Sequence, residues 1–217
     1  MRLVSTGWII VVTLLTACST RGIPDTLDPD AARLAVEATA PDRPLRVLFG
    51  WRILDGGARF SGEGAARIEP PYRARLDLFG PNGEGYLSAA LVGTDLRLPG
   101  EPDRALPPPA IIWSVLGVVR PPDDAILLGT REVEGRVELH YGVGESRLRY
   151  VLQDGRLRSV DWRGDGRRMV LELNGASGAL PTEAAYRDWS QNTELHTELE
   201  TVEEVDPYPP EIWTLGR

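Results

Sequence analysis

The chain has one cysteine, two histidines and no lysine among its 217 residues, and these scarcities exclude several classes of protein. With a single cysteine no internal disulfide can form, so burial of apolar side chains must hold the fold together. All 24 basic residues are arginine, and 32 acids outnumber them, which gives a formal charge of −8. Phosphate binding needs a clustered basic footprint that this composition lacks, so we expect no nucleic-acid partner.

Catalytic motifs are scarce as well. No Gly-x-Ser-x-Gly nucleophile motif occurs, because residues 144–148 fail at the last position. His140 and His196 lie among charged residues of predicted strands, and we interpret both as solvated. Residues 161–166 faintly resemble a calcium loop, but Arg163 occupies a ligand place. We therefore expect neither an enzyme nor a metal site.

The longest apolar run near the start of the chain is short and ends at the cysteine. Residues 8–15 follow Arg2 and lead into Leu15-Thr16-Ala17-Cys18, which resembles a bacterial lipoprotein signal. A transmembrane helix needs about 20 apolar residues, so this run is too short to span a bilayer. A secretory peptide with a chance cysteine, or an uncleaved anchor, is the alternative interpretation.

Cleavage before Cys18 predicts that this residue carries covalent diacylglycerol and an N-linked acyl chain; no other cofactor is expected. Two or more acyl chains anchor a protein stably. Ser19 lacks the acidic side chain that retains lipoproteins on the inner membrane of enteric bacteria, so we expect outer-membrane anchoring facing the periplasm. The predicted organisation is a signal peptide over 1–17, a lipidated tether over 18–27 and one domain over 28–217.

The domain is predicted to be mainly β with one N-terminal helix. Asp28-Pro29-Asp30 supplies an N-cap, a proline at the first helical position and an acidic first turn, and the good helix formers of 31–40 follow, which predicts a first helix here. From Leu45 the apolar period changes to two, as in strands. We expect strands over 45–53, 58–68, 72–78, 86–92, 95–98, 131–143, 146–153, 156–163, 167–173 and 194–205, with 184–189 ambiguous and an extended tail after Pro207.

Two further features refine this arrangement. Asp154-Gly155 and Asp165-Gly166 are strong hairpin signals. In 194–205, acids alternate with Leu195 and Leu199, which we interpret as a charged edge strand that resists aggregation.

The apolar segment 110–119 follows three prolines and is apolar on every side. Such a segment must be covered all round. It is either a buried core strand or helix, or a plug that fills a concave sheet.

Taken in order, these pieces resemble the LolA/LolB family of bacterial lipoprotein carriers and receptors, and LolB more closely. The pieces are Tyr72-Arg73-Ala74-Arg75-Leu76, the turn Pro81-Asn82-Gly83, the segment Trp113-Ser114-Val115-Leu116-Gly117, and the late hairpin over 157–173. The resemblance implies a strongly curved, unclosed antiparallel β-barrel with a short helical lid in its concavity. It also implies an apolar cavity for the acyl chains of a lipoprotein client.

On this resemblance we predict a monomeric receptor that takes lipoprotein clients or acyl chains, possibly from a periplasmic LolA-like carrier. The residues predicted to line its cavity are Phe49, Trp51, Phe60, Leu76, Leu78, Trp113, Leu116 and Tyr150. LolB exposes an apolar side chain in the loop that here contains Asn82, so Phe79 is the candidate for that insertion role. The alternative is a structural envelope lipoprotein whose barrel is filled and binds no ligand.

Overall fold

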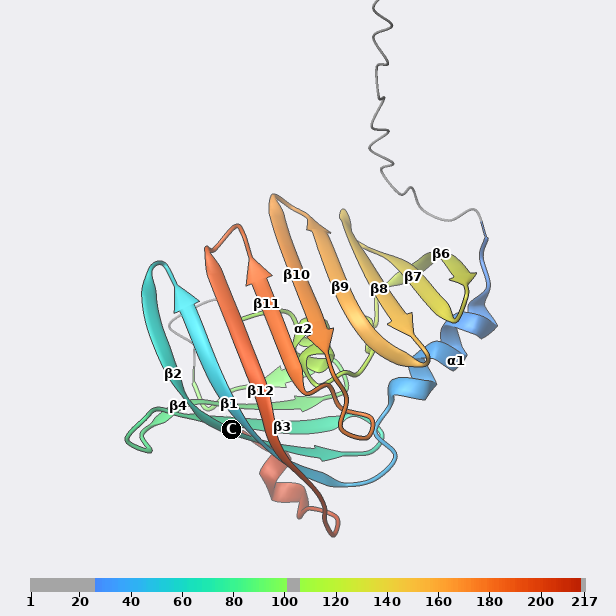
Figure 1. Ribbon diagram of the computed structural model, residues 1–217. Helices are drawn as coiled ribbons and strands as arrows, with labels where there is room; N and C mark the ends of the chain where they lie inside the picture. Colours follow the sequence, from blue (N-terminus) through green and yellow to red (C-terminus); the bar gives the residue numbers. More distant parts are fainter. Residues whose placement is uncertain (1–25, 101–105, 216–217) are drawn as a thin grey trace, which may run out of the picture.

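The alternation that begins at Leu45 forms the first strand of one twelve-stranded antiparallel sheet (Figure 1). The computed structural model describes residues 26–100 and 106–215. The strands are β1 (Leu45–Asp55), β2 (Ala58–Glu69), β3 (Arg73–Phe79), β4 (Gly85–Val92), β5 (Asp95–Arg97), β6 (Ile126–Val133), β7 (Arg136–Val143), β8 (Ser146–Gln153), β9 (Arg156–Gly164), β10 (Arg167–Asn174), β11 (Glu183–Asp188) and β12 (Thr193–Glu204). Their order in the sheet is β5-β4-β3-β2-β1-β12-β11-β10-β9-β8-β7-β6.

The sheet is curved and does not close, as the family resemblance implied. In Figure 1 the strands from β8 to β2 form an upright wall, and β3 and β4 turn beneath it. The two edges of the sheet are β5 and β6, which lie at opposite ends of the strand order. The result is a half-barrel with one concave and one convex face.

The prediction that the last strand is an edge strand is wrong. β12 pairs with β1 along its whole length on one side and with β11 on the other, so it lies in the middle of the sheet. Glu194 and Glu198 lie on the convex face, because they alternate with Leu195 and Leu199, which line the concavity. Alternation of apolar and polar residues indicates which side of a strand faces solvent, but it does not indicate how many strands pair with it.

The predicted strand over 131–143 is two strands. Glu134 and Gly135 both have positive φ, 53° and 73°, and form the tight turn that separates β6 from β7. Two positive φ values in succession are the geometry of a two-residue hairpin. The same geometry occurs at Asp154-Gly155, where a turn was predicted.

Helix α1 (Pro29–Thr39) begins where the sequence predicted. Asp28 is the N-cap, and its side chain accepts a hydrogen bond from the backbone N–H of Ala31 at 2.9 Å. The helix lies beside β6 at the end of the sheet (Figure 1). The backbone N–H of Thr130 donates to the carbonyl of Thr26 at 2.7 Å, so the segment before the helix partly covers the β6 edge.

Helix α2 (Pro109–Val115) lies in the concavity of the sheet (Figure 1). Ala110, Ile111, Trp113 and Ser114 are buried on it. The apolar segment is therefore a short helix that packs against the sheet, which is one of the two arrangements its composition allowed.

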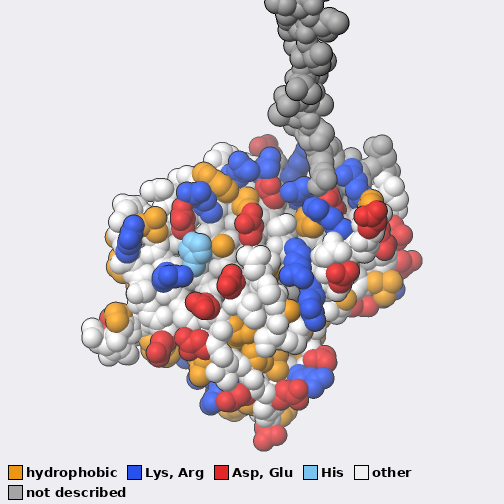
Figure 2. Space-filling view, viewed as in Figure 1, with side chains coloured by type: hydrophobic (Ala, Val, Ile, Leu, Met, Phe, Trp, Pro, Cys, Tyr) orange, Lys and Arg blue, Asp and Glu red, His pale blue; other side chains and the backbone are white. Residues whose placement is uncertain are grey.

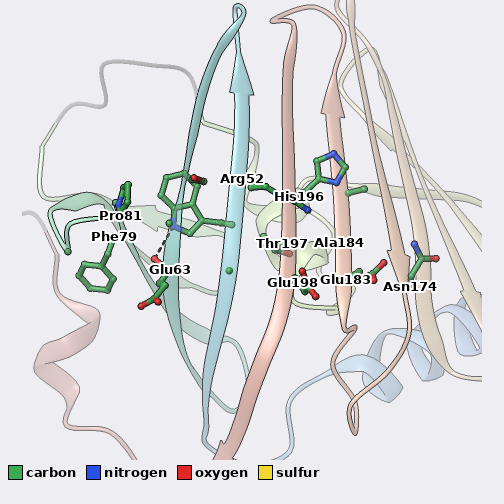
Figure 3. Close-up of a pocket in the computed structure, with 17 residues that line it drawn as sticks. Arg52, Glu63, Phe79, Pro81, Asn174, Glu183, Ala184, His196, Thr197 and Glu198 are labelled. Carbon is green, nitrogen blue, oxygen red and sulfur yellow. Dashed lines mark hydrogen bonds between the residues drawn. The ribbon is translucent and has the colours of Figure 1, made fainter.

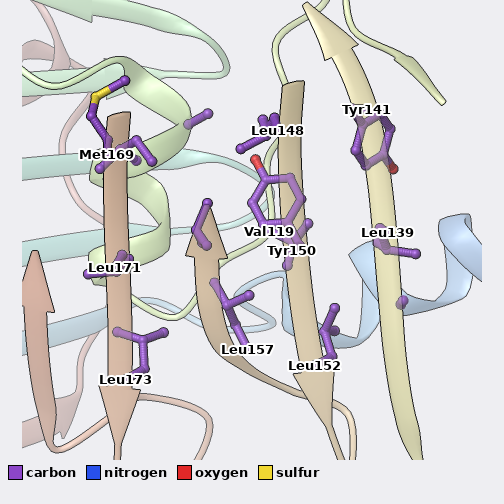
Figure 4. Close-up of a cluster of buried hydrophobic side chains, with 14 of the residues drawn as sticks. Val119, Leu139, Tyr141, Leu148, Tyr150, Leu152, Leu157, Met169, Leu171 and Leu173 are labelled. Atoms are coloured by element: carbon purple, nitrogen blue, oxygen red, sulfur yellow. The ribbon is translucent and has the colours of Figure 1, made fainter. Parts of the chain in front are cut away.

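Two clusters of buried side chains divide the interior. The first lies under β7 to β11 and packs solidly: Leu139, Leu148, Tyr150 and Leu171 are all at most 1% exposed (Figure 4). The second lies under β1 to β4 and includes Phe49, Trp51 and Trp113. Helix α2 separates the two, because Ile111 belongs to the first cluster and Trp113 to the second.

The chain after β12 was predicted as an extended tail, but it ends in a short helix on the convex face. This 3₁₀ helix, η1 (Pro210–Trp213), packs against β3 and β4. Trp213 is 3% exposed, its ring meets Tyr208 edge to face, and the guanidinium of Arg73 lies 5.8 Å from its centre. Arg97 donates to the backbone carbonyl of Trp213 at 3.0 Å.

Beside η1, the carboxylate of Asp77 is buried among cationic and polar donors. Arg67 donates to it at 2.6 Å, Arg75 at 3.0 Å and Ser88 at 2.8 Å. Burial alone would raise the pKa of Asp77, but these hydrogen bonds outweigh burial and lower the pKa below its ordinary value of 3.8.

We expect Asp77→Asn to lower the free energy of unfolding by about 1–3 kcal/mol at neutral pH, because charge-assisted hydrogen bonds are lost. A depressed folded-state pKa means that the carboxylate stabilises the fold above its unfolded-state value and loses this contribution as the pH falls through the folded-state value. Urea titrations of both proteins between neutral and strongly acidic pH should therefore converge. A constant gap across that range would contradict this account of Asp77.

Candidate functional site

An apolar cavity of about 760 Å³ opens between the concave face of the sheet and helix α2. Its volume lies within the range of about 300–1,000 Å³ that is typical of ligand sites. The walls come from β1, β3, β4, β11, β12, α2 and the segments that flank it. The residues with apolar side chains that line it include Val47, Phe49, Trp51, Ile53, Leu76, Leu78, Leu87, Ala89, Ile111, Ile112, Val115, Leu116, Leu180, Leu195 and Leu199.

The strand period explains why these side chains face one another. Phe49 on β1 is paired with Leu199 on β12, and Leu76 on β3 lies between Ala66 and Ala89 on the neighbouring strands. Small alanines beside a leucine leave space that larger side chains would fill. At Gly64 the ring of Phe49 fills the missing side chain's place, since a Cβ there would lie 2.5 Å from that ring.

One end of the cavity reaches the edge of the sheet where the hairpin turns meet, and we call this end the mouth. Asp55 at the end of β1, Gln191 in the β11–β12 turn and Thr193 at the start of β12 line it. The hydroxyl of Thr193 donates to Asp55 at 3.1 Å and ties the two turns together. Tyr86 reaches the cavity from β4, where its ring lies 4.8 Å from the ring of Trp51.

Of the eight residues predicted to line the cavity, five do so: Phe49, Trp51, Leu76, Leu78 and Leu116. Phe60 does not line the cavity, and the centre of its ring lies 5.6 Å from the centre of the Tyr86 ring. Tyr150 lies in the packed first cluster and is 0% exposed, so it does not reach the cavity (Figure 4).

Trp113 also lies outside the cavity wall. It is 0% exposed, its indole N–H donates to the carbonyl of Gly93 at 2.7 Å, and its ring meets Tyr72 edge to face. Ile112, Val115 and Leu116 present the other side of α2 to the cavity. The sequence alone could not show which side of α2 faces the cavity, because the segment is apolar all round.

The β3–β4 turn carries the two residues predicted for insertion. Phe79 is 39% exposed and Asn82 is exposed. A Cβ at Gly62 would lie 1.9 Å from the carbonyl oxygen of Phe79, so only glycine allows this turn to approach β2 so closely. Glu84 accepts a hydrogen bond from the backbone N–H of Asn82 at 3.0 Å and fixes the turn.

A second hollow of about 800 Å³ lies on the convex face over β1, β2, β11 and β12 (Figure 3). Arg52, Glu63, Glu183, His196 and Glu198 line it, together with Phe79 and Pro81 from the β3–β4 turn. The prediction of a solvated His196 holds, since it is exposed. Charged side chains make this groove a poor site for an apolar ligand.

The prediction of a solvated His140 is wrong. It lies on the convex face as expected, but it is only 9% exposed, with its Nε2 3.6 Å from the carboxylate of Glu138. Burial lowers the pKa of His140, although the neighbouring Glu138 opposes this shift.

Neither a membrane-spanning helix nor a metal cluster occurs in the described part of the chain. Over residues 26–100 and 106–215, no helix has the length and apolar character needed to cross a bilayer. Within the same ranges, no three His, Cys, Asp or Glu residues gather in a way that could hold a metal ion. Cys18 lies outside the described residues.

No protein-family profile and no curated protein sequence matches the chain. Solved structures do. A LolA superfamily protein from Nitrosomonas europaea superposes with a TM-score of 0.55 at 13% identity, covering 84% of this chain and 94% of that one. A DUF1329 family protein from Desulfovibrio piger superposes with a TM-score of 0.51 at 11% identity, covering 87% and 98%.

At these identities the likeness concerns the fold. The chain has a LolA-like fold, an open antiparallel half-barrel with helices, as the sequence resemblance implied. Its concavity is packed on one side of α2 and hollow on the other.

Proposed function

We propose that this protein binds acyl chains, or a lipidated protein through its acyl chains, in the cavity beside α2. The observation that carries this proposal is an apolar hollow of about 760 Å³ whose walls come from two arms of the curved sheet and one helix. The alternative of a wholly filled barrel has less support, because a cavity of this volume remains beside the second cluster.

The energetics of burial favour such a ligand. Each methylene moved out of water contributes about 0.8 kcal/mol, so a long acyl chain contributes roughly 10 kcal/mol. Such a chain needs a long, dry surface, and the cavity offers one formed by β1, β3, β4 and β12. The few polar side chains at its mouth, Asp55, Gln191 and Thr193, would meet the polar end of the ligand.

The lipoprotein signal of the sequence supports a location for the protein in the cell envelope. Lipidation of Cys18 would hold the protein on the outer membrane, facing the periplasm, as expected for a LolB-like receptor. A soluble LolA-like carrier is the proposed donor of the client, and Phe79 on the β3–β4 turn is the proposed insertion residue. We propose no covalent chemistry and a monomeric state.

Titration with a fluorescent long-chain fatty acid tests this function. The protein used is the chain from residue 19, without its lipid, which retains every helix and strand and both buried clusters. We expect saturable binding with one site, and competition by unlabelled palmitate. Absence of saturable binding would favour the structural envelope lipoprotein instead.

A further inference from the structure

At the mouth edge of the sheet, three arginines lie side by side on the convex face. Arg147 on β8 is paired with Arg163 on β9, and Arg163 is paired in turn with Arg168 on β10. All three are exposed, and each alternates with a residue of the first cluster or its margin, namely Leu148, Trp162 and Met169. We call Arg147, Arg163 and Arg168 the arginine row.

Like charges directly opposite each other destabilise a sheet, so this row is unfavourable for the isolated protein. Asp161 pairs with Arg163 at 2.6 Å. Within residues 26–100 and 106–215, no carboxylate forms an ion pair with Arg147 or Arg168. The acids in the adjoining turns are Glu145 and Asp165, and Asp165 accepts a hydrogen bond from Ser146. Arg147 and Arg168 therefore present two guanidiniums without a carboxylate partner among the described residues, on a protein whose formal charge is −8.

An exposed tryptophan continues the row. The backbone N–H of Trp189 donates to the carbonyl of Arg168 at 3.1 Å, and its side chain is 44% exposed. The guanidiniums of Arg168 and Arg187 lie 4.6 Å and 5.4 Å from the centre of its ring. In Figure 2, several blue side chains lie along the upper part of this face, with red ones among them.

The turn that holds Trp189 is fixed by a buried carboxylate. Asp188 is 1% exposed, binds Arg167 at 2.8 Å and accepts hydrogen bonds from the backbone N–H groups of Ser190 and Gln191. These hydrogen bonds fix the backbone of the turn beside Trp189, whose ring remains partly exposed. Gln191 of the same turn lines the cavity mouth.

We infer that the arginine row and Trp189 dock the cavity mouth against an anionic phospholipid bilayer. Arginine forks match phosphate geometry, and tryptophan favours the headgroup region of membranes. The row is complementary in charge to such a surface, whereas the rest of this acidic protein is repelled by it. Docking by this edge would bring the mouth to the membrane, where an acyl chain enters or leaves.

The biological purpose of this docking rests on the proposed acyl-binding function, but the vesicle experiment that tests the docking does not depend on that function. The chain from residue 19 is mixed with vesicles of phosphatidylcholine alone, or of phosphatidylcholine with phosphatidylglycerol, and the bound fraction is measured by sedimentation. We expect binding to the anionic vesicles only, weakened by salt. The double variant Arg147→Gln with Arg168→Gln should lower the partition coefficient about thirtyfold, as expected for two arginines near an anionic surface.

The matched control is Arg156→Gln with Arg158→Gln, at the opposite end of β9, with the same change in charge. It should retain binding within about threefold, because its side chains lie away from the docked edge. Trp189→Ala should weaken binding without changing its dependence on salt. Equal losses in the row and control variants, or no preference for anionic vesicles in the unmodified protein, would overturn the inference.

Fatty-acid titration of the same proteins separates the two proposals. Vesicle binding that depends on the row, without any fatty-acid binding, would remove the proposed function and leave the docking surface. Fatty-acid binding without vesicle binding would remove the docking surface and leave the proposed function.

Discussion

Leu76→Trp combined with Leu199→Trp is expected to lower the affinity for a fluorescent fatty acid at least about tenfold. The two leucines lie on β3 and β12 and line the cavity. If the indoles displace only two methylenes of the ligand, at about 0.8 kcal/mol each, the affinity falls by about that factor. Overpacking a wall costs about 1–3 kcal/mol of stability, so circular dichroism and urea unfolding must accompany the titration.

The control places the same side chains on the other face of the sheet. Leu48 and Leu54 alternate on β1 with the cavity residues Phe49 and Ile53, and Leu48 is 36% exposed. Leu48→Trp with Leu54→Trp should leave the affinity within about twofold, because neither indole enters the cavity. If the outer variants lose binding as much as the inner ones do, the ligand does not occupy the concave side.

Trp113→Ala is expected to lower the free energy of unfolding by about 3–5 kcal/mol, as for other large buried side chains. Trp113 is 0% exposed and hydrogen-bonds the carbonyl of Gly93, which would lose its partner in the variant. Urea unfolding measures the effect. Trp189→Ala, at an exposed position, serves as the control and should cost under about 1 kcal/mol.

The two variants separate a structural role for Trp113 from a ligand-binding role. A small loss of stability together with a large loss of fatty-acid binding would contradict the placement of Trp113 outside the cavity wall. The outcome we predict is a large loss of stability. Trp113→Phe should recover much of it, because the ring still packs against Tyr72 although the hydrogen bond is gone.

Local patterns predicted most of the strands because each depends on neighbouring residues alone. Asp154-Gly155 gives two positive φ values at low cost, and the flanking alternation fixes which side faces inward. The turn at Glu134-Gly135 could not be predicted from alternation. Val133 and Val137 are an even number of residues apart, so the alternation continues through the turn unchanged. The glycine was the only signal.

Local sequence patterns could not predict features that depend on distant residues. The central position of β12 follows from its pairing with β1, more than 130 residues away, and no residue of β12 encodes it. The hollow depends on the sizes of facing side chains. Leu139, Leu148 and Tyr150 fill one side of α2, whereas small residues such as Ala66 and Ala89 leave the other side open. Tyr150 was therefore assigned to the cavity without a signal that could place it elsewhere.

The most direct test of the central claim is photo-crosslinking with a diazirine fatty acid, mapped by peptide mass spectrometry. We predict crosslinks on the cavity wall, at Leu78, Ile112 and Leu199 among others, and their loss under excess unlabelled palmitate. Crosslinks concentrated on the convex groove around His196, or spread over the surface without competition, would contradict an acyl-binding cavity.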